Sequence, residues 1–352
     1  METKKTNRRD WLKTGLLTAG GITLFPHIGL AEMTKAPLTI DADGNALYSP
    51  FFKEFIPETF PEDNLWLAKL NANENPYGPS PKAIEALKAV AQKGNRYAWK
   101  ELFELVDKIA VKEGVSPKNI MMGPGSSDLL EKTAIVLFLN GGNVVSADPS
   151  YMSLIRVAEA TGASWKAVPL KEDWSHDLKA MEAAIDKDTK LVYICNPNNP
   201  TGSITDHEEL VDFCSRVSEK VPVFVDEAYL GFLEDGVKKS MIPLINEGKD
   251  IIVARTFSKI HGMAGLRVGY VVAQERTLDK IQKITRGGMG ISYTSVYAAL
   301  ASMDDISFQE MSRIKNAEAR EYVYDSLKKL GYDYIPSHTS FIIFPIEMDG
   351  NL

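Results

Sequence analysis

Cysteine is almost missing from this chain, since Cys195 and Cys214 are the only two among 352 residues. A pair this sparse provides no disulfide framework, and neither cysteine stands at a spacing typical of metal ligands. With five histidines in the whole sequence, we predict no metal site. Basic charge is not in excess either, because 40 Lys and Arg face 47 Asp and Glu. This balance argues against a nucleic-acid-binding surface.

Internal repeats and low-complexity tracts are also missing, which excludes repeat and fibrous architectures. The sequence is 44% hydrophobic and 25% charged, as is ordinary for a soluble globular protein. The length is sufficient for two domains. Long hydrophobic runs are limited to residues 14–30, which follow a basic start.

This N-terminal stretch predicts an export signal. Asn7-Arg8-Arg9-Asp10-Trp11-Leu12-Lys13 resembles the twin-arginine signal, and Gly29-Leu30-Ala31 resembles a cleavage site. We therefore predict a signal peptide over residues 1–31, a periplasmic or otherwise exported protein, and no membrane attachment after cleavage. A membrane anchor or a disordered basic tail are the alternatives.

Three further segments are predicted from composition and pattern. Residues 32–70 are irregular and contain several prolines, so we expect an arm that contributes to a small domain. Residues 71–288 are expected to form the large domain. Residues 289–352 are expected to form a smaller α+β domain with a strand over residues 335–344. The sequence stops in what reads as an interrupted loop, so we expect this domain to be incomplete.

From residue 100 onward, short apolar runs alternate with amphipathic helical patterns. This alternation is typical of an α/β fold with a mainly parallel sheet covered by helices on both faces. The expected strands are residues 120–122, 143–146, 164–168, 190–195, 221–225 and 251–254.

Polar residues gather where these strands end. Ser126 and Ser127 follow a Gly-Pro-Gly turn at a helix start, which predicts an anion site made of backbone amides. The turn partly matches a dinucleotide-binding fingerprint, but Asp128 occupies the place of the third glycine, so we reject NAD binding. Open α/β sheets bind ligands at the carboxyl ends of their strands, and we expect the site there.

Lys259 stands at such a strand end, between Ser258 and a glycine-rich segment that contains Arg267. A buried lysine beside another cation has a lowered pKa and can form a Schiff base with a carbonyl group. Taken alone, the same residues also fit a surface loop with two ordinary cations. Two histidines without ligand spacing, His207 and His261, are expected at the surface.

Three ordered motifs resolve this ambiguity. Asn-Pro-Asn-Asn-Pro-Thr-Gly over 196–202, Asp-Glu-Ala-Tyr over 226–229 and Arg-Thr-Phe-Ser-Lys with Gly-Leu-Arg-Val-Gly-Tyr over 255–270 resemble the class I/II, fold type I, pyridoxal-phosphate aminotransferases. The Asn-Glu-Asn-Pro-Tyr-Gly element at 73–78 and Arg96-Tyr97 resemble the histidinol-phosphate aminotransferase subgroup. The resemblance covers about residues 65–345, and it implies that the sheet is of the seven-stranded type found in fold type I.

The resemblance implies a role for each matched residue. Lys259, Asp226 and Tyr229 are the implied catalytic residues: Lys259 holds the cofactor aldehyde as an internal aldimine and then moves a proton, and Asp226 faces the pyridine nitrogen. Tyr151 is implied to stack on the ring, although a plain core tyrosine is the alternative. The implied cofactor is pyridoxal 5′-phosphate. Its implied contacts are Asn199 and Tyr229 at the phenolate oxygen, and Ser126, Ser127, Thr256, Ser258 and Arg267 at the phosphate.

Tyr97 resembles a tyrosine that reaches the phosphate from a neighbouring subunit, which implies a homodimer with shared sites. The sequence departs from the family pattern at Ala98, which replaces a proline, and at Ser340, which replaces an asparagine. No residue matches the family arginine that pairs with the substrate carboxylate.

The resemblance implies transfer of an amino group from an amino acid, or from a histidinol-phosphate-like amine, to a 2-oxo acid. A decarboxylase of the threonine-phosphate decarboxylase type is the alternative enzyme. A periplasmic binding protein with an α/β core is the alternative without catalysis. The donor and the acceptor are not specified by these motifs.

Overall fold

The computed structural model describes residues 70–345. The predicted signal peptide, the predicted arm and the interrupted loop lie outside the described residues. Asn71 and the residues that follow it belong to one compact unit. The predicted division of this unit at residue 288 stays a prediction.

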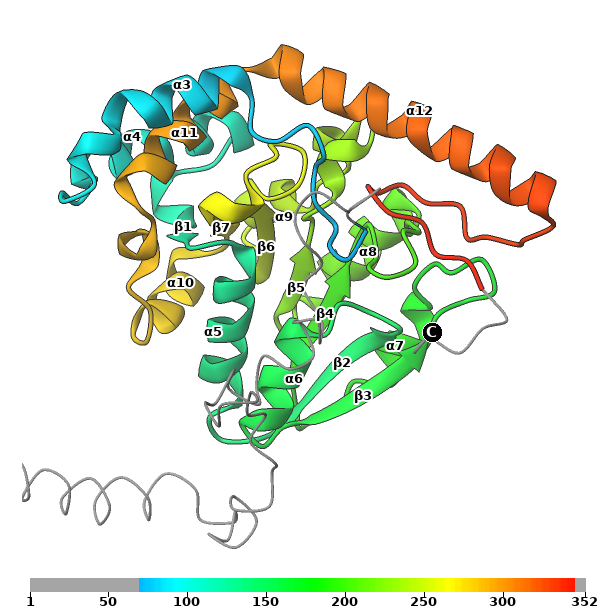
Figure 1. Cartoon of the computed structure of the whole chain (residues 1–352). Helices are drawn as coiled ribbons and strands as arrows, with labels where there is room; N and C mark the ends of the chain where they lie inside the picture. The colour runs from blue at the N-terminus through cyan, green and yellow to red at the C-terminus, as the bar shows by residue number, and fades with distance from the viewer. Residues whose placement is uncertain (1–69, 346–352) are drawn as a thin grey trace, which may run out of the picture. The chain divides into compact units, whose positions relative to one another are not determined.

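A seven-stranded sheet forms the centre of this unit (Figure 1). Its strands lie in the order β1-β7-β6-β5-β4-β2-β3, and all neighbours run parallel except β7, which pairs antiparallel with both β1 and β6. The strands are β1 Ile120–Gly123, β2 Asn143–Asp148, β3 Ser164–Pro169, β4 Thr189–Cys195, β5 Val223–Asp226, β6 Ile251–Thr256 and β7 Gly269–Val272.

The sheet confirms the predicted α/β class, and each expected strand is present with ends shifted by at most two residues. β7 was not expected, because it lies inside the motif at 255–270, where glycines and a charged residue break the apolar run. Because β7 runs antiparallel to β6, its first residue, Gly269, lies at the edge where β6 ends.

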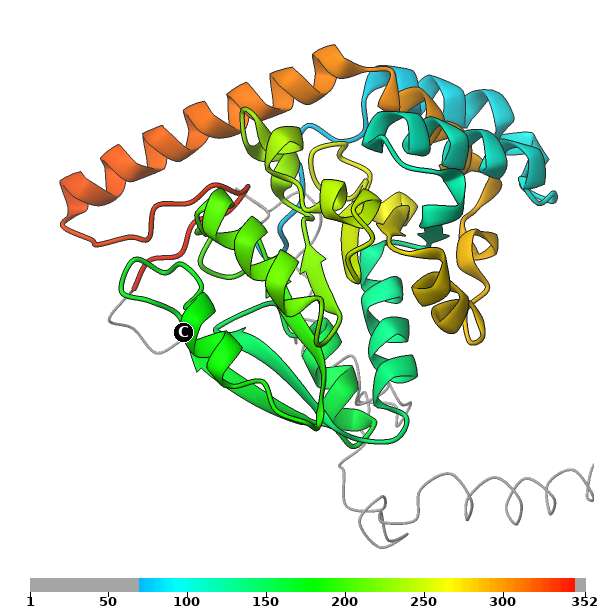
Figure 2. The ribbon, with the colours of Figure 1, turned by 180° about the vertical axis from the view of Figure 1, so that it is seen from behind.

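Helices cover both faces of the sheet, as predicted (Figures 1 and 2). Inward side chains of α5, α6 and α10 share one apolar cluster with one face of the strands. Those of α4, α7, α8 and α9 share a second cluster with the other face. The helices are α4 Trp99–Glu113, α5 Ser126–Phe138, α6 Ser153–Ala160, α7 Leu178–Ala183, α8 His207–Val217, α9 Ile242–Asn246 and α10 Glu275–Gln282.

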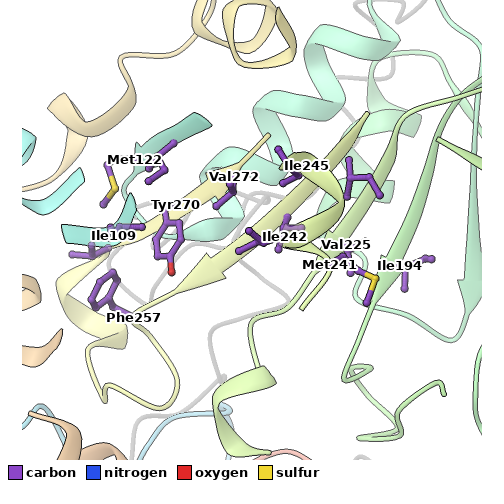
Figure 3. Packing of buried hydrophobic residues seen from close by; sticks show 14 of the residues in the cluster. Ile109, Met122, Ile194, Val225, Met241, Ile242, Ile245, Phe257, Tyr270 and Val272 are labelled. Atoms are coloured by element: carbon purple, nitrogen blue, oxygen red, sulfur yellow. The ribbon is translucent and has the colours of Figure 1, made fainter. Parts of the chain in front are cut away.

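Alternation along each strand produces these two clusters, because successive side chains of a strand point to opposite faces. In β4, Val192 and Ile194 belong to the α8 side, whereas Tyr193 belongs to the α5 side. Figure 3 shows part of the α8-side cluster, where Val225 and Ile194 approach Met241 before α9. Each fully buried aliphatic side chain contributes about 1.5–3 kcal/mol, so the sheet is a rigid platform for its strand ends.

Three more helices extend this core. α3 (Pro81–Val90) begins at Ser80, whose hydroxyl accepts a hydrogen bond from the Ala83 amide at 3.2 Å. α11 (Tyr293–Met303) packs on α3 and α4. α12 (Ile306–Leu330) ends at Gly331 in the left-handed conformation, which glycine adopts without strain.

The segment after α12 runs back along that helix (Figures 1 and 2). Our prediction of a strand over residues 335–344 is wrong: this segment has no regular structure, and it closes on itself with one backbone hydrogen bond, from Ile335 to Ile343. A strand requires a neighbouring strand for pairing, and side chains of α12 hold this segment instead. Arg320 and Asn316 both donate to the Thr339 carbonyl, at 2.9 and 3.0 Å.

Candidate active site

The polar strand ends predicted from the sequence lie along one edge of the sheet. Parallel β4, β5 and β6 all end there. The first residue of β7, Gly269, pairs with both Gly123 at the end of β1 and Thr256 at the end of β6. The antiparallel return therefore brings Arg267 to the edge that carries Ser126, Asp226 and Lys259.

An anion-binding cradle forms where β1 passes into α5. No side chain caps the start of α5, so the amides of its first turn remain available as donors. Gly125 has a φ of +88°, and a Cβ atom there would lie 2.1 Å from Nη2 of Arg267. A Cβ atom at Gly269 would lie 2.4 Å from the Ser126 nitrogen. Two glycines thus allow a guanidinium group and a helix N-terminus to meet, which suits a phosphate group.

Two hydroxyl groups of the β6 turn border this cradle. Arg267 donates from Nη1 to the Ser258 hydroxyl at 3.4 Å and to the Ala264 carbonyl at 3.0 Å. The Thr256 hydroxyl accepts from the Ser258 amide at 3.0 Å, which leaves its own O–H as a donor. The predicted phosphate ligands Ser258 and Arg267 are therefore in contact, and Thr256 is hydrogen-bonded to the Ser258 amide.

Lys259 projects from the same turn into a half-enclosed position. Its Nζ donates to the Asn73 carbonyl at 2.7 Å and lies 5.2 Å from the centre of the Tyr229 ring. The Asn73 side chain donates to the Tyr229 hydroxyl at 3.1 Å. Burial lowers the pKa of Lys259, Asp226 opposes this shift, and Arg267 adds to it. A lowered pKa increases the fraction of neutral, nucleophilic amine.

Asp226 is buried at the end of β5. Its Oδ1 accepts a hydrogen bond from the Ala228 amide at 3.1 Å. Burial raises the pKa of Asp226 to about 6, although that hydrogen bond and the charge of Lys259 act in the other direction. The carboxylate is therefore costly in the chain alone, and a cationic partner would relieve the cost.

The remaining predicted residues within the cluster are Tyr151 and Asn199. The Tyr151 hydroxyl lies 3.2 Å from the Ser127 hydroxyl, and burial raises the pKa of Tyr151. Asn199 is half-buried in the loop after β4, and its side chain makes no hydrogen bond within residues 70–345. Its amide is thus available to a ligand.

Within the described part of the chain, Tyr97 makes no contact with the other predicted site residues. Its side chain is 71% exposed, and its ring lies 5.9 Å from that of Trp99 at the start of α4. A surface position is what a contact across a subunit boundary requires.

Sequence reasoning missed the importance of Asn73 and Asn75. Asn75 is buried, and its Nδ2 donates to the Ile260 carbonyl and to the Ser312 hydroxyl, both at 3.2 Å. It therefore ties the loop of residues 71–78 to the Lys259 turn and to α12. The available signal was the family element that starts at Asn73, but polarity alone is common in loops.

Three neighbours have structural roles. Cys195 is buried in β4, as predicted. Glu227, also buried, accepts from the Met241 amide at 2.7 Å and pairs with Arg255 at 3.0 Å. The expected surface position of His261 is wrong: it is buried, 2.7 Å from the Ser302 hydroxyl, and burial lowers the pKa of His261 to about 3.

Within the described residues, no group of three or more His, Cys, Asp and Glu side chains could hold a metal ion. Among the helices between residues 70 and 345, none is long and apolar enough to cross a bilayer.

Pyridoxal 5′-phosphate fits the residues present. The α5 cradle with Arg267 matches its phosphate, the half-enclosed Lys259 amine matches its aldehyde, and the buried Asp226 carboxylate matches its ring nitrogen. The unpaired amide of Asn199 suits its phenolic oxygen. Fold and site therefore define an α/β enzyme that uses this cofactor.

Comparisons with known proteins identify the family. The family model for aminotransferase class I and II matches residues 67–347. Histidinol-phosphate aminotransferase from Halalkalibacterium halodurans is 36% identical over 285 residues, covering 81% of this chain and 77% of the relative. Histidinol-phosphate aminotransferase 1 from Dechloromonas aromatica is 37% identical over 278 residues, covering 79% and 76%.

A solved structure agrees with this result. Histidinol-phosphate aminotransferase from Sinorhizobium meliloti, in complex with pyridoxal 5′-phosphate, has a TM-score of 0.73 and 29% identity, over 80% of this chain and 76% of that one. The chain belongs to the class I and II aminotransferase family. It is a transaminase that uses pyridoxal 5′-phosphate. Neither the decarboxylase nor the binding-protein alternative is favoured by these relatives.

Proposed function

We propose that the amino donor of this transaminase is histidinol phosphate or a closely similar amine, and that a 2-oxo acid is the acceptor. The similarity to histidinol-phosphate aminotransferases over about four-fifths of the chain supports this donor. The single observation that carries the proposal is the 73–78 loop, an element of that subgroup, whose Asn73 carbonyl accepts from Nζ of Lys259. A subgroup-specific loop thus lies against the reacting amine.

The proposed roles of the site residues follow from their contacts. When bound, the cofactor supplies an aldehyde and an electron-withdrawing ring. Lys259 would hold the aldehyde end of the cofactor with its amine, and the same amine would move a proton at the substrate Cα. Asp226 would face the ring nitrogen and favour its protonated form. Asn199 and Tyr229 would donate to the phenolic oxygen, and Tyr151 would cover the ring.

The proposed phosphate site uses both backbone and side chains. The first amides of α5, at Ser126 and Ser127, would donate to the phosphate, and Arg267 would offer a planar pair of donors. The hydroxyl groups of Thr256 and Ser258 complete the set of donors. These contacts fix the cofactor at one end, so that Lys259 meets the aldehyde in a constant orientation.

A donor panel tests the substrate. The loaded enzyme is mixed with histidinol phosphate, histidinol, glutamate and phenylalanine, and conversion of the cofactor is followed by absorbance in a single half-reaction. We expect histidinol phosphate to react with the highest kcat/KM, and unphosphorylated histidinol to react at least tenfold less well, because an anionic group contributes more than 1.4 kcal/mol of binding. A higher kcat/KM for glutamate or phenylalanine would contradict the proposed donor.

We also propose that the enzyme is a homodimer with shared sites. Exposed apolar side chains gather at the start of α4, namely Tyr97, Trp99 and Phe103, with Met289 close to Tyr97 across a small groove. Such a patch is typical of an interface. Tyr97 would then reach the phosphate of the neighbouring subunit.

Mixed dimers test this arrangement. Lys259→Ala and Tyr97→Ala chains are inactive or impaired alone, but a dimer of the two holds one intact site if Tyr97 acts across the interface. After random exchange of subunits, activity is expected to reach about a quarter of the wild-type value, because half of the dimers carry one intact site of two. No gain on mixing would place Tyr97 in its own subunit's site or outside catalysis.

Export through the twin-arginine route is proposed from residues 1–31, and it is tested with a reporter enzyme fused to this segment. We expect export of the fusion, and its loss on replacement of both Arg8 and Arg9 by lysine. Replacement of Lys4 and Lys5 by arginine is the matched control. Export that persists without the arginine pair would refute the route.

A further inference from the structure

Tyr193 carries a buried hydroxyl group that the reaction described above does not use. The residue lies in the middle of β4 with 0% exposure, and its ring packs on Phe224 with the ring centres 6.0 Å apart. Its hydroxyl oxygen has no hydrogen-bond partner among the described residues. Buried phenols normally have a partner, because an unpaired O–H group is costly.

The register of the sheet places Tyr193 beside Asp226. Tyr193 lies opposite Phe224, and Cys195 lies opposite Asp226, two residues further along each strand. Side chains two residues apart share a face of the sheet. Asp226 is therefore the diagonal neighbour of Tyr193, at a separation that an aromatic side chain spans.

The Asp226 carboxylate can accept a further hydrogen bond from the Tyr193 hydroxyl. An ionised carboxylate accepts about four hydrogen bonds, but within residues 70–345 the Asp226 carboxylate accepts one, from the Ala228 amide. The hydroxyl of Tyr193 is among the groups that lower the pKa of Asp226 against the effect of burial.

Two other donors near the carboxylate are already engaged. The Cys195 thiol donates to the Pro197 carbonyl at 3.5 Å. The Tyr151 hydroxyl pairs with that of Ser127. The Tyr193 hydroxyl, by contrast, is fully buried and has no partner among the described residues.

We propose that Tyr193 is a positioning residue for Asp226: in the loaded enzyme its O–H group donates to the carboxylate, keeps it ionised and keeps it turned toward the ring nitrogen of the cofactor. This inference rests on the proposed role of Asp226. Tyr193 acts through that carboxylate and does not touch the substrate.

The test is Tyr193→Phe, which removes one oxygen atom and keeps the ring. The full-length enzyme is loaded with pyridoxal phosphate labelled with ¹⁵N in the ring, and the ¹⁵N chemical shift is followed against pH. Without the donated hydrogen bond, the pKa of Asp226 rises by about one unit, and the carboxylate competes better for the proton that it shares with the ring. We therefore expect the ring ¹⁵N shift at neutral pH to move toward the value of the unprotonated ring. The matched control is Tyr270→Phe, which removes a buried hydroxyl group on the opposite face of the sheet, where it donates to Glu113 at 2.6 Å.

An unchanged ring ¹⁵N shift in Tyr193→Phe would overturn the inference, and so would an equal change in Tyr270→Phe. A merely structural tyrosine would lower the melting temperature and leave this shift in place. Asp226→Asn distinguishes a failure of the Tyr193 inference from a failure of the proposed role of Asp226. If Asp226→Asn moves the shift toward the unprotonated ring and Tyr193→Phe does not, the inference on Tyr193 alone fails; if neither moves it, the role of Asp226 fails.

Should Tyr193→Phe not fold, the unsubstituted chain provides a second measurement. With labelled tyrosine, the loaded enzyme is expected to show a slowly exchanging hydroxyl proton on Tyr193. Its exchange at the rate of an exposed tyrosine hydroxyl would contradict a bond to Asp226.

Discussion

Asp226 is expected to destabilise the cofactor-free protein, so that Asp226→Asn is the more stable chain at neutral pH. Burial raises the pKa of this carboxyl from 3.8 to about 6. A difference of about two units corresponds to about 3 kcal/mol at 1.36 kcal/mol per unit. The folded state therefore favours the protonated form, and ionisation at neutral pH opposes folding.

The sign of the pH dependence follows from this shift. Between pH 4 and pH 6 the folded chain binds more protons at Asp226 than the unfolded chain does, so the free energy of unfolding falls as the pH rises through that window. Below pH 4 the carboxyl group is neutral in both states and the cost disappears. Asparagine carries no charge at any pH, and its side-chain oxygen still accepts from the Ala228 amide.

Urea denaturation of the cofactor-free chains from pH 3.5 to pH 8 measures this effect. We expect the free energy of unfolding of Asp226→Asn to exceed that of wild type by up to about 3 kcal/mol at pH 8, and the two values to converge near pH 4. Asp279→Asn, at an exposed position of α10, controls for the amide substitution itself. A variant that is no more stable than wild type at pH 8 would refute the reasoning on burial.

Two further substitutions probe the supports of the site. Gly125→Ala is expected to weaken cofactor binding at least tenfold, about 1.4 kcal/mol, because its Cβ would displace the Arg267 guanidinium. The control is Gly162→Ala, at a position with a φ of +95° and no neighbour within 4 Å. Equal cofactor affinity in both variants would contradict the proposed phosphate cradle. Asn75→Ala removes two hydrogen bonds that the side chain donates and one that it accepts from the Tyr77 amide. Urea denaturation is therefore expected to show that the free energy of unfolding falls by about 2–4 kcal/mol. A fall of less than about 0.5 kcal/mol would mean that other contacts hold the loop.

Much of this fold was predictable because its signals are local. The runs at 190–195 and 251–254 are apolar, short and followed by polar residues, which is how a buried parallel strand ends at a ligand edge. The phosphate cradle was predictable in part for the same reason, since the Gly-Pro-Gly turn before Ser126 marks a helix start.

What the sequence could not provide depends on contacts between distant residues. The link from Asn73 to Lys259 spans 186 positions, and no local pattern encodes it. His261 has no ligand spacing and follows Lys259 in a glycine-rich segment, which indicated a surface position, but the packing of Phe257 and the hydroxyl of Ser302 bury it. The segment at 335–344 ends in an apolar run and resembles a strand, yet only the fold determines whether a pairing strand is present.

The most direct test of the account is covalent trapping of the cofactor. The full-length enzyme is loaded with pyridoxal 5′-phosphate, reduced with borohydride and digested, and the labelled peptide is sequenced by mass spectrometry. The account predicts one labelled residue, Lys259, and no label in Lys259→Ala. Label on another lysine, or equal labelling of the Ala variant, would contradict the claim that this amine is the centre of the active site.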